Sequence, residues 1–179
     1  SLGIRYFGAS GRDLRWESKR WVFRGVSSSH IDEHEVEHLS DNVGTLLTSE
    51  PTSALLERAS SLGVLTAVEV CNDNVEEQLR SLSRWPCVAI AILPNNISDR
   101  QMLRAAAGNI LLGERLDTSN ADAPADWAEV AFCDASDLEA FDAATKTLAI
   151  PIIAERPLVG DYTLLEARRA CDALQRDLA

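Results

Sequence analysis

The sequence predicts an α/β fold in which helices wrap a parallel sheet. Three observations support this class. Short apolar runs alternate with stretches of helical periodicity along the whole chain. The run at 87–93 is apolar throughout and the run at 64–70 is mostly apolar, which is typical of strands buried on both faces of a parallel sheet. The length of 179 residues is enough for one domain with a sizeable core.

Local sequence signals predict the strands and helices up to residue 63. The apolar run 21–26 predicts a strand, and the polar stretch 29–39 after it is helix-like. A second strand is predicted at 44–48. Pro51 then begins a helix, because proline fits the first helical turn, and Gly63 ends it. The apolar stripe of this helix contains Ala54, Leu55, Leu56, Ala59 and Leu62.

The same alternation continues to the end of the chain. The strands at 64–70 and 87–93 flank a helix over 75–82, and Pro94 ends the second of them. A polar loop without a helical pattern follows the fifth strand. The remaining elements are predicted as helix 99–107, strand 109–113, strand 128–133, helix 137–148, strand 150–154 and helix 163–178.

Two folds fit seven strands separated by helices. A doubly wound sheet would carry helices on both faces and a ligand crevice at a switch point. A (β/α)8 barrel would need an eighth strand and usually about 250 residues. The pattern alone leaves both open. The chain contains neither GxGxxG nor GxxxxGK[ST], which argues against nucleotide binding, and no cofactor is expected.

Charge and composition narrow the classes of partner. The 17 basic and 28 acidic residues give a net charge of −11, which argues against nucleic acid and anionic membranes as partners. No apolar run approaches the ~20 residues of a membrane span, and the start has no signal-peptide pattern. The four cysteines show no CxxC spacing and are interpreted as unpaired, although a secreted chain could still bridge them. The only methionine is Met102, so we expect a piece of a longer or processed protein.

Four segments together favour the barrel. Residues 3–26, 55–69, 85–96 and 150–156 resemble, in the right order, the catalytic domain of glycoside hydrolase family 2, the β-galactosidase and β-glucuronidase family. They are similar to the hairpin and first strand, the second helix and third strand, the fourth strand, and the seventh strand of that family. The resemblance implies a (β/α)8 TIM-barrel-like fold with about seven β/α units present. Residues 1–20 would form a hairpin leading into one barrel domain at 21–179.

The resemblance fails at the catalytic carboxylates. Asn95 matches the family asparagine that binds the sugar 2-hydroxyl, but Asn96 stands where the acid/base glutamate is expected. An amide cannot donate a proton as a carboxylic acid does. A gapless count puts Arg156 at the nucleophile position and Glu155 one residue early. A shift of one residue moves a side chain from one face of a strand to the other. A one-residue deletion would restore Glu155. The family's second-strand arginine has no counterpart at 45–49.

Acidic side chains close to the predicted strand ends are further candidates, because a barrel places its active site there. They are Glu69, Glu114, Asp134 and Glu155. The alternative interpretation is structural: these carboxylates would cap the next helix or pair with Arg115 and Arg156. Asn95 and Asn96 would then be turn residues after Pro94.

The segment His34-Glu35-Val36-Glu37-His38 is a formal HExxH motif. On a helix, His34 and His38 would share one face and could bind zinc, with Glu35 as general base. The segment is strongly acidic and lacks the apolar residues of a buried zinc-protease helix. A solvated helix is the favoured interpretation, and a metal site is the alternative.

Three hypotheses on function result. The leading one is a glycosidase-like domain with degraded catalytic carboxylates, acting as a carbohydrate-binding or structural module. Its expected substrate-binding residues are Asn95, Asn96, Glu114, Asp134 and Arg156. The second is an active O-glycosyl hydrolase that uses Glu155 with a displaced acid, Glu69 or Glu114. The third is the zinc site.

The missing eighth strand predicts exposed sheet edges. The first and seventh strands would need to be covered, paired between two copies of the chain, or completed by adjoining sequence. We therefore expect a homo-oligomer or neighbouring domains of a longer chain.

Overall fold

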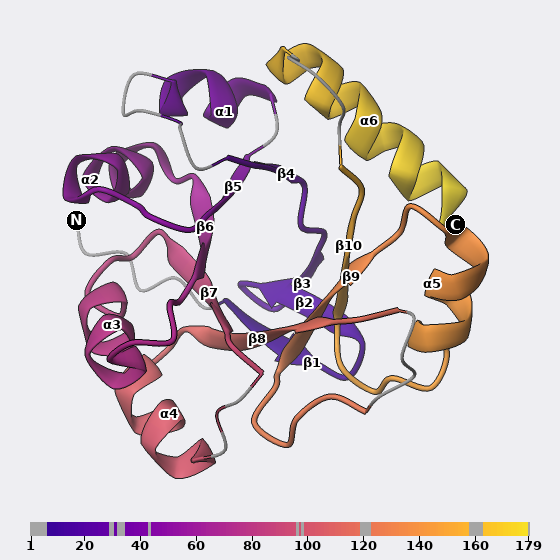
Figure 1. The fold of residues 1–179 in the computed structure, drawn as a ribbon. Coiled ribbons are helices and arrows are strands. Elements are labelled where there is room, and N and C mark those ends of the chain that lie inside the picture. The colour runs from indigo at the N-terminus through magenta and orange to yellow at the C-terminus, as the bar shows by residue number, and fades with distance from the viewer. Residues whose placement is uncertain are drawn as a thin grey trace.

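The computed structural model describes residues 7–28, 31, 35–42, 44–95, 97, 99–118, 123–157 and 163–178. Seven parallel strands form one sheet that curls into a half-barrel (Figure 1). The strands are β4 (Gly25–Ser27), β5 (Thr45–Thr48), β6 (Leu65–Glu69), β7 (Val88–Leu93), β8 (Leu111–Leu116), β9 (Val130–Asp134) and β10 (Ile152–Glu155). Each pairs with the next along the chain, from β4 to β10. The predicted incomplete TIM-barrel-like fold is confirmed.

Helices cover the outer face of the sheet (Figure 1). They are α1 (Val36–Asn42), α2 (Ser53–Leu62), α3 (Val75–Leu82), α4 (Arg100–Ala107), α5 (Leu138–Thr145) and α6 (Leu164–Asp177). In α2 the Thr52 hydroxyl accepts from the Leu55 amide at 3.1 Å, and Gly63 ends the helix with a φ of 77°. None of the helices in the described ranges is long and apolar enough to cross a membrane.

Apolar cores lie on both faces of the half-barrel. The outer core packs strand residues such as Leu46, Val68 and Leu112 against the helices. The inner core fills the concave face, with Leu65, Ile90 and Phe132 among its members. These opposite faces follow from the two-residue period of a strand, and they decide which strand-end residues face inward.

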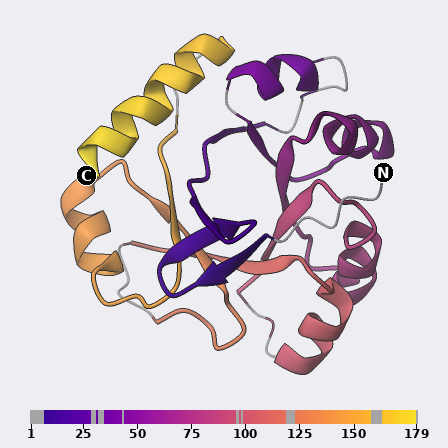
Figure 2. The ribbon, with the colours of Figure 1, turned by 180° about the vertical axis from the view of Figure 1, so that it is seen from behind.

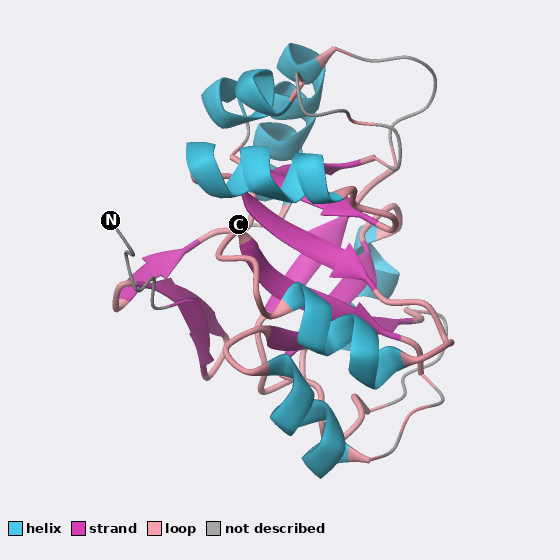
Figure 3. Cartoon of the chain, turned by 90° about the vertical axis from the view of Figure 1, so that its left-hand side faces the viewer, coloured by secondary structure: helices cyan, strands magenta, loops and turns pink. Residues whose placement is uncertain are grey.

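A second sheet covers the end of the half-barrel at which the strands begin (Figures 2 and 3). It contains the antiparallel strands β1 (Phe7–Ser10), β2 (Asp13–Trp16) and β3 (Lys19–Trp21). The prediction of a single strand over 21–26 is wrong, because Trp21 ends β3 and β4 begins only at Gly25.

Aromatic packing explains this break. The Trp21 ring meets those of Phe7 at 5.3 Å and Phe23 at 5.7 Å, between ring centroids. Phe23 in turn reaches Phe132 of the inner core at 6.2 Å. Trp21 and Phe23 therefore join the small sheet to the inner core, and the segment between β3 and β4 does not continue a barrel strand.

The helix α6 covers the open side of the half-barrel, between the edge strands β4 and β10. Arg24, directly before β4, pairs with Asp172 at 3.2 Å, and the Cys171 thiol donates to the Gly25 carbonyl oxygen at 3.3 Å. Arg156, directly after β10, pairs with Asp177 at 2.9 Å. One helix thus contacts the chain beside both edges.

Candidate functional site

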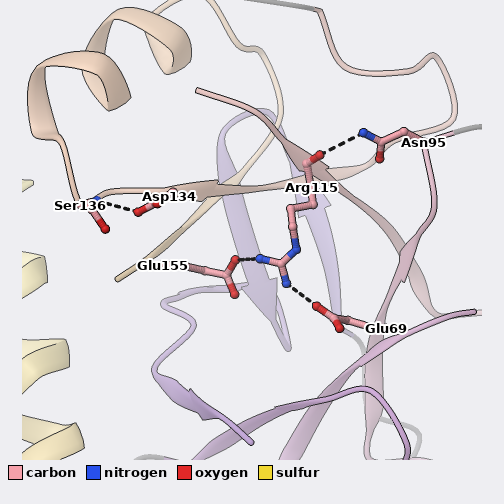
Figure 4. A network of polar contacts seen from close by, with 6 residues as sticks. All are labelled: Glu69, Asn95, Arg115, Asp134, Ser136 and Glu155. Atoms are coloured by element: carbon pink, nitrogen blue, oxygen red, sulfur yellow. Dashed lines mark hydrogen bonds and ion pairs between the residues drawn. The ribbon is translucent and has the colours of Figure 1, made fainter. Parts of the chain in front are cut away.

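Four charged side chains gather at the end of the half-barrel where the strands finish (Figure 4). Strand alternation places them: Glu69 follows Leu65 and Ala67, and Glu155 follows Ile153, all of which lie in the inner core. Arg115 comes two residues after Gly113, where a β-carbon would meet inner-core side chains. Asp134 comes two residues after Phe132, which lies in the inner core. The cluster therefore forms at the concave end of β6, β8, β9 and β10.

Arg115 lies at the centre of this cluster. Its Nη1 donates to Glu155 Oε2 and its Nη2 donates to Glu69 Oε1. The Asn95 side-chain amide donates to the backbone carbonyl oxygen of Arg115 at 3.4 Å. One guanidinium group therefore joins β8 to β6 and β10, and the segment after β7 contacts the same residue.

Glu155 occupies the least exposed position of the three ion-paired side chains. Its side chain is 24% exposed, against 40% for Glu69 and 44% for Arg115. Burial raises the pKa of the Glu155 carboxyl above its ordinary value, and the charges of Glu69 and Asp134 add to this increase. The nearby Arg115 opposes it. A raised carboxyl pKa suits proton donation, while the ion pair favours the charged form.

Asp134 ends β9 and makes a local bond. Its Oδ1 accepts from the Ser136 amide at 2.7 Å. Hydrogen bonding by the Ser136 side chain, and then by this amide, lowers the pKa of the Asp134 carboxyl. Sequence reasoning did not identify Ser136. The run Asp134-Ala135-Ser136 carried the signal, because an aspartate often bonds the backbone two residues further on.

Other predicted residues lie outside the cluster. Glu114 is buried, and its Oε2 accepts from the Ala125 amide at 2.6 Å, so it supports the segment after β8. Arg156 pairs with Asp177 on α6, and its Nε donates to the Ala135 carbonyl oxygen at 3.3 Å. Asn96 lies outside the described residues.

The structure agrees with the structural interpretation of the acidic residues at two positions, because Glu69 and Glu155 pair with Arg115. Asp134 instead bonds the backbone before α5, whose N-cap is Asp137. Sequence reasoning named Arg115 only as a pairing partner. Its central place depends on β8 continuing to Leu116, beyond the predicted strand end at Gly113.

The histidine motif is only partly described. His34 lies outside the described residues, and His38 lies on α1. Within the described ranges, no group of three or more histidine, cysteine, aspartate or glutamate side chains could hold a metal ion. The four cysteines are not joined by disulfides, and Cys87 and Cys133 are buried. Burial, with a smaller effect of Glu155, raises the pKa of Cys133 to about 11.

Comparisons with known proteins give a match at the level of fold. No protein-family model and no curated protein matches the sequence. Among solved structures, the chain is similar to the GH2 β-galacturonidase from Eisenbergiella tayi bound to galacturonate, with a TM-score of 0.61 and 13% identity. It is also similar to β-glucuronidase 2 of Bacteroides uniformis, covalently bound to cyclophellitol-6-carboxylate aziridine, with a TM-score of 0.65 and 14% identity.

These matches cover most of this chain and a minor part of the enzymes. They include 90% and 88% of this chain, but only 41% of the galacturonidase and 27% of the glucuronidase. Identity this low shows the fold alone. The chain therefore has a glycoside-hydrolase-like fold, as its resemblance to the barrel of glycoside hydrolase family 2 predicts.

Proposed function

We propose that the concave end of the half-barrel binds carbohydrate through Glu69, Arg115, Asp134 and Glu155, and that it does not hydrolyse glycosidic bonds. The glycoside-hydrolase-like fold supports a sugar as ligand, and the first matched enzyme was solved with galacturonate. Carboxylate and guanidinium groups from four strands of the same sheet suit a ligand rich in hydroxyl groups.

The contact of Arg115 with both glutamates is the observation that carries this proposal. A retaining glycosidase needs one carboxylate free to attack and a second carboxyl able to donate a proton, about 5–5.5 Å apart. Here one guanidinium group occupies both carboxylates and favours their charged forms. The sequence also has an amide, Asn96, at the position that resembles the family's acid/base.

Hydrolysis is the second candidate, and one observation favours it. Glu155 faces inward beside two further carboxylates, and burial raises its pKa, as expected of a general acid. In this candidate Glu155 donates the proton and Glu69 is the second carboxylate, which reverses the roles that the resemblance implies for them.

A paired assay separates the two candidates. Wild type and Glu155→Gln are tested for hydrolysis of a panel of aryl glycosides, and for binding of the same sugars by ligand-observed NMR. We expect saturable binding with no turnover, and weaker binding to Glu155→Gln. Turnover by wild type that disappears in Glu155→Gln would establish the hydrolase, and absence of binding to any sugar would refute the proposed function.

A further inference from the structure

The candidate cluster contains an excess of negative charge. Glu69, Asp134 and Glu155 contribute three carboxylates and Arg115 one guanidinium, so the charge with all groups ionised is 1 − 3 = −2. Both terminal nitrogens of Arg115 already hold a carboxylate of the chain itself. The arginine is therefore not a free counter-ion for an acidic ligand.

The segments that follow the strands extend this negative charge. Exposed acidic residues lie after five of the strands: Glu50 after β5, Asp73 after β6, Asp99 after β7, Asp117 after β8 and Asp137 after β9. Among the described residues of these segments and of the one after β10, the only base is Arg156. Arg156 pairs with Asp177 on α6. A ligand approaching this end therefore meets a mainly negative field.

We infer that the carbohydrate site takes neutral or cationic sugars and rejects uronates, with Glu69 and Asp134 as the residues that set this selectivity. The inference rests on the proposed function. Arg115 keeps further N–H donors, but each of its terminal nitrogens already contacts a carboxylate, so a ligand carboxylate that binds there adds a third negative charge beside Glu69 and Glu155, which costs Coulomb energy. A neutral sugar pays no such cost, and the ammonium group of a hexosamine is attracted by the same carboxylates.

Distance and salt separate the roles of the two groups of acids. Screening at physiological salt acts over about 8 Å, so the cluster carboxylates affect a bound ligand more than the exposed acids of the segments. The exposed acids act mainly on approach and at low salt. Replacing Glu69 or Asp134 by its amide should therefore change selectivity, whereas a charge at the opposite end of the molecule should not.

The test compares three methyl β-glycosides that differ in charge: the neutral hexoside, the hexuronide and the 2-amino-2-deoxyhexoside. Both gluco and galacto series are used. Dissociation constants for wild type are measured by ligand-observed NMR in buffer of low ionic strength and again at high salt. We expect the uronide to bind about five- to tenfold more weakly than the neutral sugar at low salt, with a smaller ratio at high salt.

Variants test which residues cause the preference for the neutral sugar over the uronide. Glu69→Gln and Asp134→Asn should each reduce the ratio between neutral sugar and uronide. Glu17→Gln is the matched control, because it removes the same charge from an exposed turn between β2 and β3 at the other end of the molecule. It should leave the ratio unchanged.

The outcomes distinguish this inference from the proposed function. Tightest binding by the uronide would refute the selectivity while leaving carbohydrate binding intact. Equal effects of Glu17→Gln, Glu69→Gln and Asp134→Asn would refute the assignment to the cluster. Binding of none of the three glycosides in either series would contradict both.

Discussion

Glu155 couples the candidate site to stability through its titration. Its folded-state pKa lies above the ordinary value of 4.5, chiefly because of burial. Between the unfolded and folded pKa values the folded state holds more protons, so stability falls as pH rises through this window. Glu155→Gln removes this titration. We expect the variant to gain stability relative to wild type as pH rises above about 4.5, as measured by urea unfolding at a series of pH values.

Asp134 supplies the control, since its pKa is lowered by its bonds to Ser136. Its contribution is present at pH values above its ordinary 3.8 and is lost only as pH falls below it. Asp134→Asn should therefore lack the pH-dependent gain expected for Glu155→Gln. A constant difference between Glu155→Gln and wild type over the window would contradict the prediction.

The orientation of Glu155 shows what local sequence leaves undecided. The run 150–154 is apolar at every position, so it contains no alternation to indicate which face is inward. The resemblance, counted without a gap, favoured Arg156 over Glu155. In the structure Ile153 lies in the inner core, which turns Glu155 inward and leaves Arg156 beside α6. Packing across the sheet determines this choice, and it depends on residues far away in sequence.

At the level of elements, the edge strand β4 depends on a close approach at Gly25. A β-carbon at this position would lie 2.6 Å from the Thr45 carbonyl oxygen and 2.9 Å from its carbonyl carbon. Because those atoms belong to the backbone of β5, they cannot move without disturbing the pairing. We expect Gly25→Ala to lower the free energy of unfolding by about 1–3 kcal/mol, as measured by urea denaturation.

Gly8→Ala is the matched control for this substitution. Gly8 also lies on a strand, but a β-carbon there would meet nothing within 4 Å. The variant should be as stable as wild type to within about 0.5 kcal/mol. Equal stability of Gly25→Ala and wild type would show that β4 adjusts without cost.

The docking of α6 is testable through its thiol. The Thr163 hydroxyl accepts from the Glu166 amide at 3.3 Å, and Glu166 Oε2 accepts from the Thr163 amide at 2.8 Å, so the helix begins with a capping box. Thr163→Ala removes half of this arrangement. We expect the half-buried Cys171 to react about fivefold faster with a thiol reagent, because α6 opens more often.

This measurement uses a Cys71→Ser background, because Cys71 is exposed and would react first. The buried Cys87 and Cys133 report global unfolding. Thr52→Ala is the control, since it removes a similar cap from α2. Reaction of Cys171 only together with Cys133, at equal rates in both variants, would show that α6 does not open separately.

At the scale of the whole molecule, the sequence predicted the fold more fully than the site. The apolar runs at 64–70 and 87–93 correspond to β6 and β7, and Gly63 ends α2 as predicted. Propensity and periodicity act within a single helix or strand, so they can be recognised in the sequence. The cluster around Arg115 arises from four strands brought together by curling of the sheet, and no local pattern specifies which charges then meet.

At the same scale, the small sheet contributes to the core of the half-barrel, so the unfolding of the two sheets can be tested for coupling. Leu14 on β2 is 5% exposed and lies in the inner core with strand residues such as Leu47 and Leu65. If the two sheets unfold as one unit, Leu14→Ala should destabilise the entire chain by about 2–5 kcal/mol. Far-UV circular dichroism measures this directly, because it reports mainly on helices and all described helices follow β4.

Tryptophan fluorescence is recorded in the same urea titration, because two of the four tryptophans, Trp16 and Trp21, lie in the small sheet and would give a separate transition if it unfolds alone. We expect both signals to shift together in Leu14→Ala. Val22→Ala is the control, since Val22 is 46% exposed and its replacement should cost less than about 0.5 kcal/mol. An early fluorescence transition in Leu14→Ala, with an unchanged circular dichroism midpoint, would show that the small sheet unfolds separately. The half-barrel would then be stable without the sheet that covers its amino-terminal end.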